Sequence, residues 1–161
     1  RGLNGRGRRA AKRMGRYLVA SGLAPDLVLC SQARRARETL EHLGQAIPAD
    51  ARICLERGLY LAGSQDVLAR LARVANSVDR VLVVGHNPGL QDLAVALAPA
   101  RSDQAPGTRE MRLALALKFP TAALVRFEIK AGRWSELSSR LARLLAFVTP
   151  ADLEAADAKT G

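Results

Sequence analysis

A histidine directly follows a short apolar run near the middle of the chain. The run is Val81–Val84, glycine at Gly85 interrupts it, and the histidine is His86. An apolar, mostly β-branched run cut by glycine is typical of a strand buried on both faces of a parallel sheet. The following Asn87 and Pro88 predict a helix start, with Asn87 as its N-cap. We therefore expect His86 at the carboxyl end of a strand, where α/β sheets bind ligands and where helix N–H groups favour an anion. The alternative is a structural histidine at the strand end, hydrogen-bonded to a carbonyl.

A second strand-to-helix junction lies upstream. Residues 27–30 predict a short buried strand, Ser31 is a plausible N-cap, and Arg34, Arg35 and Arg37 fall in the first turns of the helix that follows. Arginine at this end opposes the helix dipole by up to about 1 kcal/mol, a cost that a bound anion would offset. Its planar guanidinium also binds two oxyanion oxygens at once. The sequence thus predicts an anion site, with solvated surface arginines as the alternative for at least two of the three.

The composition favours an anionic partner. The 161 residues carry 25 Lys and Arg against 15 Asp and Glu, a net charge of +10. Candidate partners are a phosphorylated protein, a small phosphate ester or a nucleic acid, and a solvated basic surface is the alternative. Because only 4% of residues are aromatic, a base-stacking surface is disfavoured and nucleic acid is the least favoured partner. No apolar stretch approaches the ~20 residues that a membrane span needs, so we expect no membrane association.

The two cysteines indicate a cytoplasmic protein without a metal centre. Cys30 and Cys54 lie in apolar runs and have no C-x-x-C spacing. Such cysteines are usually buried free thiols of a reducing compartment. We expect no metal and no cofactor.

Hydrophobic periodicity and turn residues predict alternating helices and strands. Expected helices cover about 8–21, 32–45, 64–76, 87–98, 111–117 and 139–148, and expected strands cover 27–30, 52–55, 81–84 and 122–129. The segment 150–161 is expected to be a polar, frayed tail. This order predicts a single three-layer α/β/α domain over 1–161, with a mostly parallel central sheet.

Several motifs, in this order, resemble those of the histidine phosphatase superfamily. They are LNGRG at 3–7, SQARRARET at 31–39 and VGHNP at 84–88. The short length, with YLA at 60–62 and FPTAAL at 119–124, is similar to the SixA-type phosphohistidine phosphatases in particular. The resemblance runs along nearly the whole chain and implies a phosphoglycerate mutase-like fold with a phosphate pocket at the carboxyl ends of the strands.

The resemblance also implies roles for individual residues. The catalytic residues would be Arg35, which holds phosphoryl oxygens, His86, which adds a hydrogen-bond donor, and Glu56, the candidate proton donor. A charge exposed in a loop is an equally good interpretation of Glu56. Substrate-binding candidates are Asn4, Ser31, Asn87 and Thr121.

One family feature is missing from these residues. The family's Arg-His-Gly motif, which carries the phosphorylated histidine on the first strand, should precede Leu3, and neither His42 nor His86 can replace it. We expect a first strand upstream of this sequence, with an inactive relative as the alternative. The resemblance then implies a metal-independent phosphatase that acts through a phosphohistidine intermediate on protein phosphohistidine. The alternatives are a phosphatase of small phosphate esters and a non-catalytic basic module that binds phosphoprotein or nucleic acid.

Overall fold

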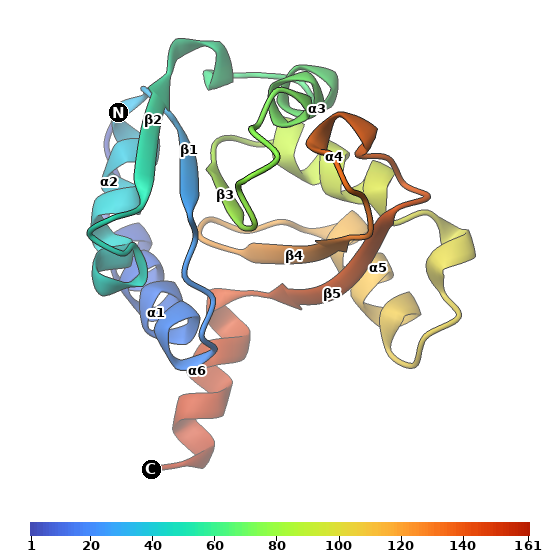
Figure 1. Cartoon of the computed structure of the whole chain (residues 1–161). Coiled ribbons are helices and arrows are strands. Elements are labelled where there is room, and N and C mark those ends of the chain that lie inside the picture. Colours follow the sequence, from blue (N-terminus) through green and yellow to red (C-terminus); the bar gives the residue numbers. More distant parts are fainter.

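The computed structural model describes residues 1–161 and is a mixed α/β fold (Figure 1). The helices are α1 (Gly5–Ala20), α2 (Arg34–Leu43), α3 (Ser64–Ala72), α4 (Gly89–Leu97), α5 (Thr108–Leu117) and α6 (Pro150–Lys159). The strands are β1 (Leu27–Ser31), β2 (Arg52–Glu56), β3 (Val81–Val84), β4 (Leu124–Ile129) and β5 (Ala142–Val148).

Strand β1 is the centre of a parallel three-stranded sheet with the order β2-β1-β3. In the sheet register, Leu29 lies between Cys54 of β2 and Val83 of β3. All five β1 residues are buried. Because side chains alternate along a strand, Leu29 packs with the cluster that includes α3 and α4, whereas Val28 packs with Ala36 of α2. Helices thus cover both faces, and the expected three-layer α/β/α architecture is confirmed (Figure 1).

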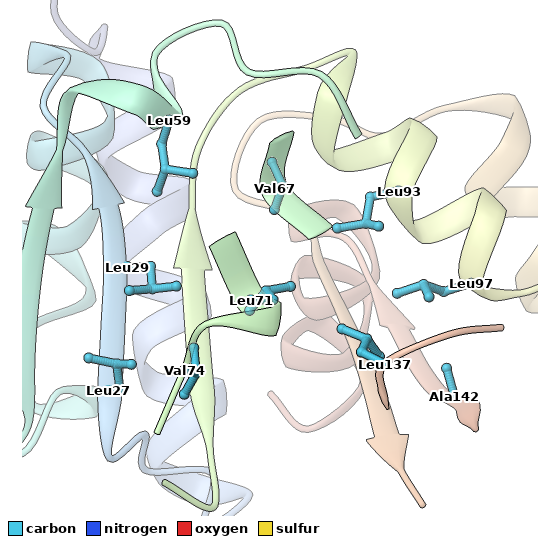
Figure 2. Packing of buried hydrophobic residues seen from close by; sticks show 10 residues of the cluster. All are labelled: Leu27, Leu29, Leu59, Val67, Leu71, Val74, Leu93, Leu97, Leu137 and Ala142. Atoms are coloured by element: carbon cyan, nitrogen blue, oxygen red, sulfur yellow. The ribbon is translucent and has the colours of Figure 1, made fainter. Parts of the chain in front are cut away.

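The main core lies between β1, α3, α4 and the C-terminal segments. Figure 2 shows how side chains from these distant parts of the chain point into one apolar space. Its ten buried members are Leu27, Leu29, Leu59, Val67, Leu71, Val74, Leu93, Leu97, Leu137 and Ala142. Aliphatic side chains make up the whole cluster, as expected from the low aromatic content.

Helices α1 and α2 form the layer on the other face. Asn4 caps α1, because its side-chain oxygen accepts a 2.8 Å hydrogen bond from the Gly7 N–H. Met14 and Leu18 of α1 pack against Leu43 at the end of α2. The helices approach closely at Gly15, where any Cβ would overlap the Leu43 carbonyl oxygen.

Strand β3 is less buried than its apolar sequence predicts. Only Val84 is buried, whereas Val81, Leu82 and Val83 are half-buried. The reason is that β3 pairs only with β1, so its second edge has no strand beside it. Strand β4 likewise pairs only with β5. The strand buried on both faces is β1, and two sheet edges remain open between β3 and β4.

The prediction of a helix over 139–148 is wrong. These residues include β5, which pairs antiparallel with β4 over the register Leu124↔Val148 to Ile129↔Ala142. In its first half, buried Ala142 and Leu144 alternate with exposed Arg143, whose guanidinium lies 2.8 Å from the Glu128 carboxylate on β4. The apolar run suits a helix or a strand, and the free backbone groups of β4 decide in favour of the strand.

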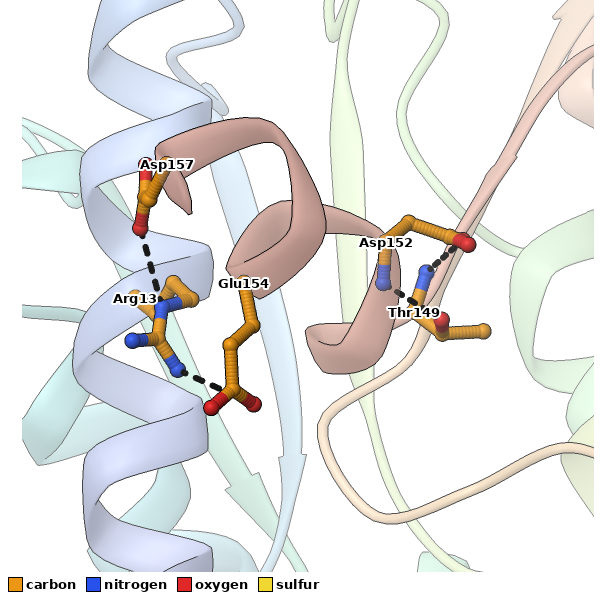
Figure 3. A network of polar contacts seen from close by, with 5 residues as sticks. All are labelled: Arg13, Thr149, Asp152, Glu154 and Asp157. Carbon is orange, nitrogen blue, oxygen red and sulfur yellow. Dashed lines mark hydrogen bonds and ion pairs between the residues drawn. The ribbon is translucent and has the colours of Figure 1, made fainter. Parts of the chain in front are cut away.

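The expected frayed tail forms helix α6 instead. Thr149 accepts a 3.2 Å bond from the Asp152 N–H, Asp152 accepts one of 2.9 Å from the Thr149 N–H, and Pro150 opens the helix (Figure 3). Arg13 of α1 links α6 to the domain through Asp157 at 3.2 Å. These local signals sit within a polar segment, which is why its composition suggested a tail. Every helix of the structure is too short or too polar to span a lipid bilayer.

Gly15→Ala tests the close approach of α1 and α2. Alanine favours helices by about 1 kcal/mol over glycine, but its methyl group would overlap the Leu43 carbonyl and push the two helices apart. We expect a net loss of roughly 1–3 kcal/mol of unfolding free energy, measured by urea denaturation. Gly132→Ala is the matched control, since nothing lies within 4 Å of a Cβ there. Equal stability of the two variants would contradict the close packing.

Candidate functional site

Two polar side chains meet at the carboxyl edge of the parallel sheet. Ser31 ends β1, His86 lies two residues after β3, and the His86 Nε2 is 2.8 Å from the Ser31 Oγ. The Ser31 hydroxyl also accepts a 3.2 Å hydrogen bond from the Ala33 N–H, just before α2. Because a hydroxyl can both donate and accept, this contact serves either protonation state of the imidazole. Ser31 is fully buried and orients His86.

Burial and a nearby cation favour the neutral form of His86. Burial lowers the pKa of His86 below its ordinary value of 6.5, and the positive charge of Arg35 lowers it further. Arg35 lies in the first turn of α2 and is exposed. An anion placed between the two side chains would reverse the second effect, because its negative charge favours the imidazolium.

Arg35 and His86 line the same cavity, which has a volume of about 390 Å³. At the carboxyl edge of the sheet its walls include polar groups of Thr39, Asn87 and Thr121. Further along β3 the walls are apolar and come from α1, α2, β3 and β4, namely Met14, Leu18, Leu43, Leu82 and Leu124. The cavity therefore joins a polar end near Arg35 and His86 to an apolar slot between β3 and β4.

Two loops shape the polar end. The Asn87 side-chain amide donates a 2.7 Å hydrogen bond to the Phe119 carbonyl, which ties the turn after β3 to the loop before β4. The Asn87–Pro88 peptide bond is cis and α4 begins at Gly89. Asn87 is therefore not the helix N-cap that the sequence predicted. It holds the Phe119 loop in place and lines the cavity.

Tyr60 and two strained residues also belong to the site, and the sequence did not single them out as site residues. The Tyr60 ring stands edge-on to the His86 imidazole, with centroids 5.6 Å apart and an angle of 87°. Leu61 and Ala122 both line the cavity and have positive φ angles of 51° and 60°. Such backbone angles are uncommon outside glycine and cluster at functional sites. Leu61 and Ala122 lie in the YLA and FPTAAL segments that carry the family resemblance, but their positive φ angles have no local sequence signal because neither residue is glycine.

Of the four predicted substrate-binding residues, three lie at the cavity or next to His86 and the fourth, Asn4, does not. Asn87 and Thr121 line the cavity with Arg35 and His86, and Ser31 forms a hydrogen bond with the His86 ring. Asn4 is used as the α1 cap and is not among the cavity-lining residues.

Glu56 lies outside this cavity. Its two carboxylate oxygens accept hydrogen bonds of 2.7 and 2.8 Å from the Arg70 Nε of α3. The carboxylate is thus held in a half-buried ion pair on the α3 face of the sheet. The structure also contains no cluster of three or more His, Cys, Asp or Glu side chains that could hold a metal ion.

The arrangement is suited to a tetrahedral oxyanion. A guanidinium fork can bind two oxygens, and an imidazole beside it can hold a third once the anion raises its pKa. Arg35 projects from the first turn of α2, where the helix dipole adds to the positive potential. Arg35 and His86 therefore have the chemical groups needed to bind a phosphoryl group and to stabilise its charge.

Comparison with known proteins gives relatives over most of the chain. No protein-family profile matches the sequence. The uncharacterized protein Rv1276c of Mycobacterium tuberculosis is 40% identical over 146 residues, which is 90% of this chain and 86% of that protein. The uncharacterized protein ML1117 of Mycobacterium leprae is 33% identical over 145 residues, covering 90% of this chain and 84% of the relative.

Solved structures with the same fold are described as SixA proteins. A candidate phosphohistidine phosphatase SixA from Nakamurella multipartitia superposes with a TM-score of 0.79 and 28% identity, over 93% of this chain and 85% of that one. A candidate SixA from Agrobacterium tumefaciens gives 0.72 and 26%, over 92% and 83%. These neighbours support a phosphatase function. The chain belongs to the same family as Rv1276c and ML1117, and its structural neighbours are SixA phosphohistidine phosphatases of the histidine phosphatase superfamily.

Proposed function

We propose that this protein is a metal-independent phosphatase that removes phosphate from phosphohistidine on a protein, through a phosphohistidine of its own. The observation that carries the proposal is the convergence of Arg35 and His86 on one cavity at the carboxyl edge of the sheet. The SixA neighbours support the phosphohistidine substrate, and the net charge of +10 favours an anionic partner.

Arg35 and His86 bind and stabilise the phosphoryl group in this proposal. The Arg35 guanidinium holds two oxygens, and His86, protonated once the anion is bound, donates to another. Ser31 positions the His86 ring, and Arg35 belongs to the first turn of α2. Phosphoryl transfer needs mainly positioning and charge stabilisation from the protein, which these residues can supply.

The nucleophile is an imidazole carried by an extended segment in the slot between β3 and β4. Both facing strand edges are unpaired, and the cavity walls along β3 are apolar, as a buried strand requires. A strand parallel to β3 in this slot would end beside His86 and Arg35. The proposal therefore places the histidine of the upstream strand, expected from the family resemblance, at the end of this segment.

The steps balance without a metal. A neutral imidazole nitrogen of the segment attacks phosphorus, the bond from phosphorus to the substrate nitrogen breaks, and the departing imidazole is neutralised by a proton from solvent. Water then attacks phosphorus, the second phosphorus–nitrogen bond breaks, and phosphate leaves while the imidazole is regenerated. Glu56 is bonded to Arg70 outside the cavity, so it is not the proton donor in these steps.

Removing the Arg35 guanidinium tests the phosphoryl site. In the protein expressed from its complete gene, Arg35→Ala should lower kcat/KM for a phosphohistidine protein by about 10²–10³, because one charge-stabilising group is lost. Phosphate release measures this rate. Arg34→Ala is the matched control, because Arg34 is the adjacent exposed arginine, bonds to Glu38 at 2.7 Å and is not a cavity residue. The proposal is abandoned if Arg35→Ala and His86→Ala both turn over normally.

The protonation of His86 should respond to phosphate. In the free protein, burial and Arg35 hold the His86 pKa below 6.5, so the ring is neutral at pH 7. A bound dianion favours the charged ring and should raise this pKa, so the affinity for the phosphate dianion increases as pH falls toward the raised value. NMR titration of the imidazole signals, with and without phosphate, measures the shift. His42 on α2 is the internal control, and equal responses of both histidines would rule out the assigned contact.

Hydrogen exchange tests the slot. In the protein from the complete gene, the β3 amides that do not face β1 should exchange as slowly as those of β1, because the inserted segment pairs with them. Exchange followed by NMR or mass spectrometry gives the rates. Fast exchange at these amides in an active enzyme would show that the nucleophile reaches the site by another route.

A further inference from the structure

The opposite edge of the parallel sheet exposes apolar side chains. Strand β2 pairs only with β1, and Ile53 and Leu55 on its outer half are 48% and 47% exposed. Both side chains border a shallow groove beneath α2, whose apolar walls include Leu40, Ile47 and Pro48. An exposed, apolar edge strand is a template for pairing with another strand, and most proteins cover or charge such edges.

The free backbone groups of β2 belong to Ile53 and Leu55. The Arg52 N–H donates to Asp26 at 3.0 Å, and the Glu56 carbonyl accepts from Gln32 at 3.2 Å, so these two residues direct their backbone groups toward β1. Since the direction alternates along a strand, Ile53 and Leu55 direct theirs to the open side. On that side the Leu55 carbonyl oxygen has one neighbour, the exposed Gln32 side-chain amide, and the distance of 3.5 Å is too long for a strong hydrogen bond.

We propose that two copies of this chain associate through β2, paired antiparallel about a two-fold axis at Cys54. In this register Ile53 lies opposite Leu55 of the second copy, and the two residues exchange both backbone hydrogen bonds. The same pair recurs on the other side of the axis, so the free groups of both residues are satisfied. Cys54 then faces Cys54 of the second copy in a close pair, where the Cα atoms are about 4.5 Å apart.

In this register the charged residues of β2 lie opposite residues of the other sign on the second copy. Arg52 lies opposite Glu56 of the second copy, on the α3 face of both strands, and would join the ion pair that this Glu56 forms with Arg70 of its own copy. The second Arg52–Glu56 pair follows by symmetry. Opposite charges placed across strands stabilise pairing, whereas like charges oppose it. The groove rim on the α2 face likewise carries one cation, Arg37, and one anion, Glu41. This self-complementarity favours a second copy of the chain over an unrelated strand.

The interface leaves the proposed phosphatase site open. Strands β2 and β3 flank β1 on opposite sides, so the cavity with Arg35 and His86 lies across the sheet from the paired edge. The two β2 strands would join the parallel sheets of the two copies into one continuous sheet. Each copy carries a net charge of +10, so repulsion between copies opposes association at low ionic strength. Added salt should therefore strengthen the dimer.

Sedimentation velocity over a concentration series tests the association. At about 0.15 M salt, the wild-type chain should show a monomer–dimer equilibrium, and Ile53→Lys should raise its dissociation constant roughly tenfold or more by placing a charge on the apolar edge. Val19→Lys is the matched control, because Val19 on α1 is a similarly exposed apolar residue at 53%. A wild-type monomer at every concentration, or equal effects of the two variants, would overturn the proposal.

Disulfide trapping tests the register. Diamide, which takes two electrons and two protons from a pair of thiols, should convert the wild-type dimer into a covalent one on a non-reducing gel. Cys54→Ser should abolish the product and Cys30→Ser should retain it, because Cys30 is fully buried at the centre of the sheet. A dimer that forms in solution but gives no Cys54 crosslink would place the interface elsewhere. Both assays are independent of phosphate turnover, so they fail or succeed separately from the proposed function.

Discussion

The parallel pairing of β1 with strands on both sides is the constraint on which the rest of the structure depends. Burial of all five β1 residues requires helices on both faces, with α1 and α2 on one side and α3 and α4 on the other. Because the strands are parallel, their carboxyl ends come to one edge. Ser31 and His86 meet at that edge for this reason, although they lie far apart in the sequence.

The same constraint sets the electrostatics of the site. A hydroxyl buried at the end of β1 needs partners, and the Ala33 N–H and the His86 ring supply them. This contact holds the imidazole in a half-buried position near Arg35, and both the burial and the guanidinium lower the pKa of His86. The site thus combines a positive charge with partial burial, and no Asp or Glu side chain lines its cavity. The negative charge of a phosphoryl group would pair with Arg35 and would raise the pKa of His86.

Much of the architecture could be predicted because its signals are local. The apolar runs before Ser31 and His86 and the cap at Asn4 each have a physical meaning that does not depend on distant residues. The run over 142–148 has no such unique meaning, since its apolar residues suit a helix as well as a strand. Pairing with β4 settles it, and that pairing joins segments which no local pattern connects. The helix at Pro150 was missed for a different reason: its polar composition outweighed a clear N-terminal cap.

The sequence by itself determined that His86 would follow one strand and that Arg35 would lie in the first turns of the helix after another, because strand periodicity and helix starts are recognised from neighbouring residues. Tertiary structure alone decided what surrounds them. The Tyr60 ring packs edge-on against His86, and Asn87 donates a hydrogen bond to the Phe119 loop. Glu56 accepts hydrogen bonds from Arg70 outside the cavity. Each of these contacts joins residues from separate loops or elements, whose mutual placement depends on how helices and strands pack around β1.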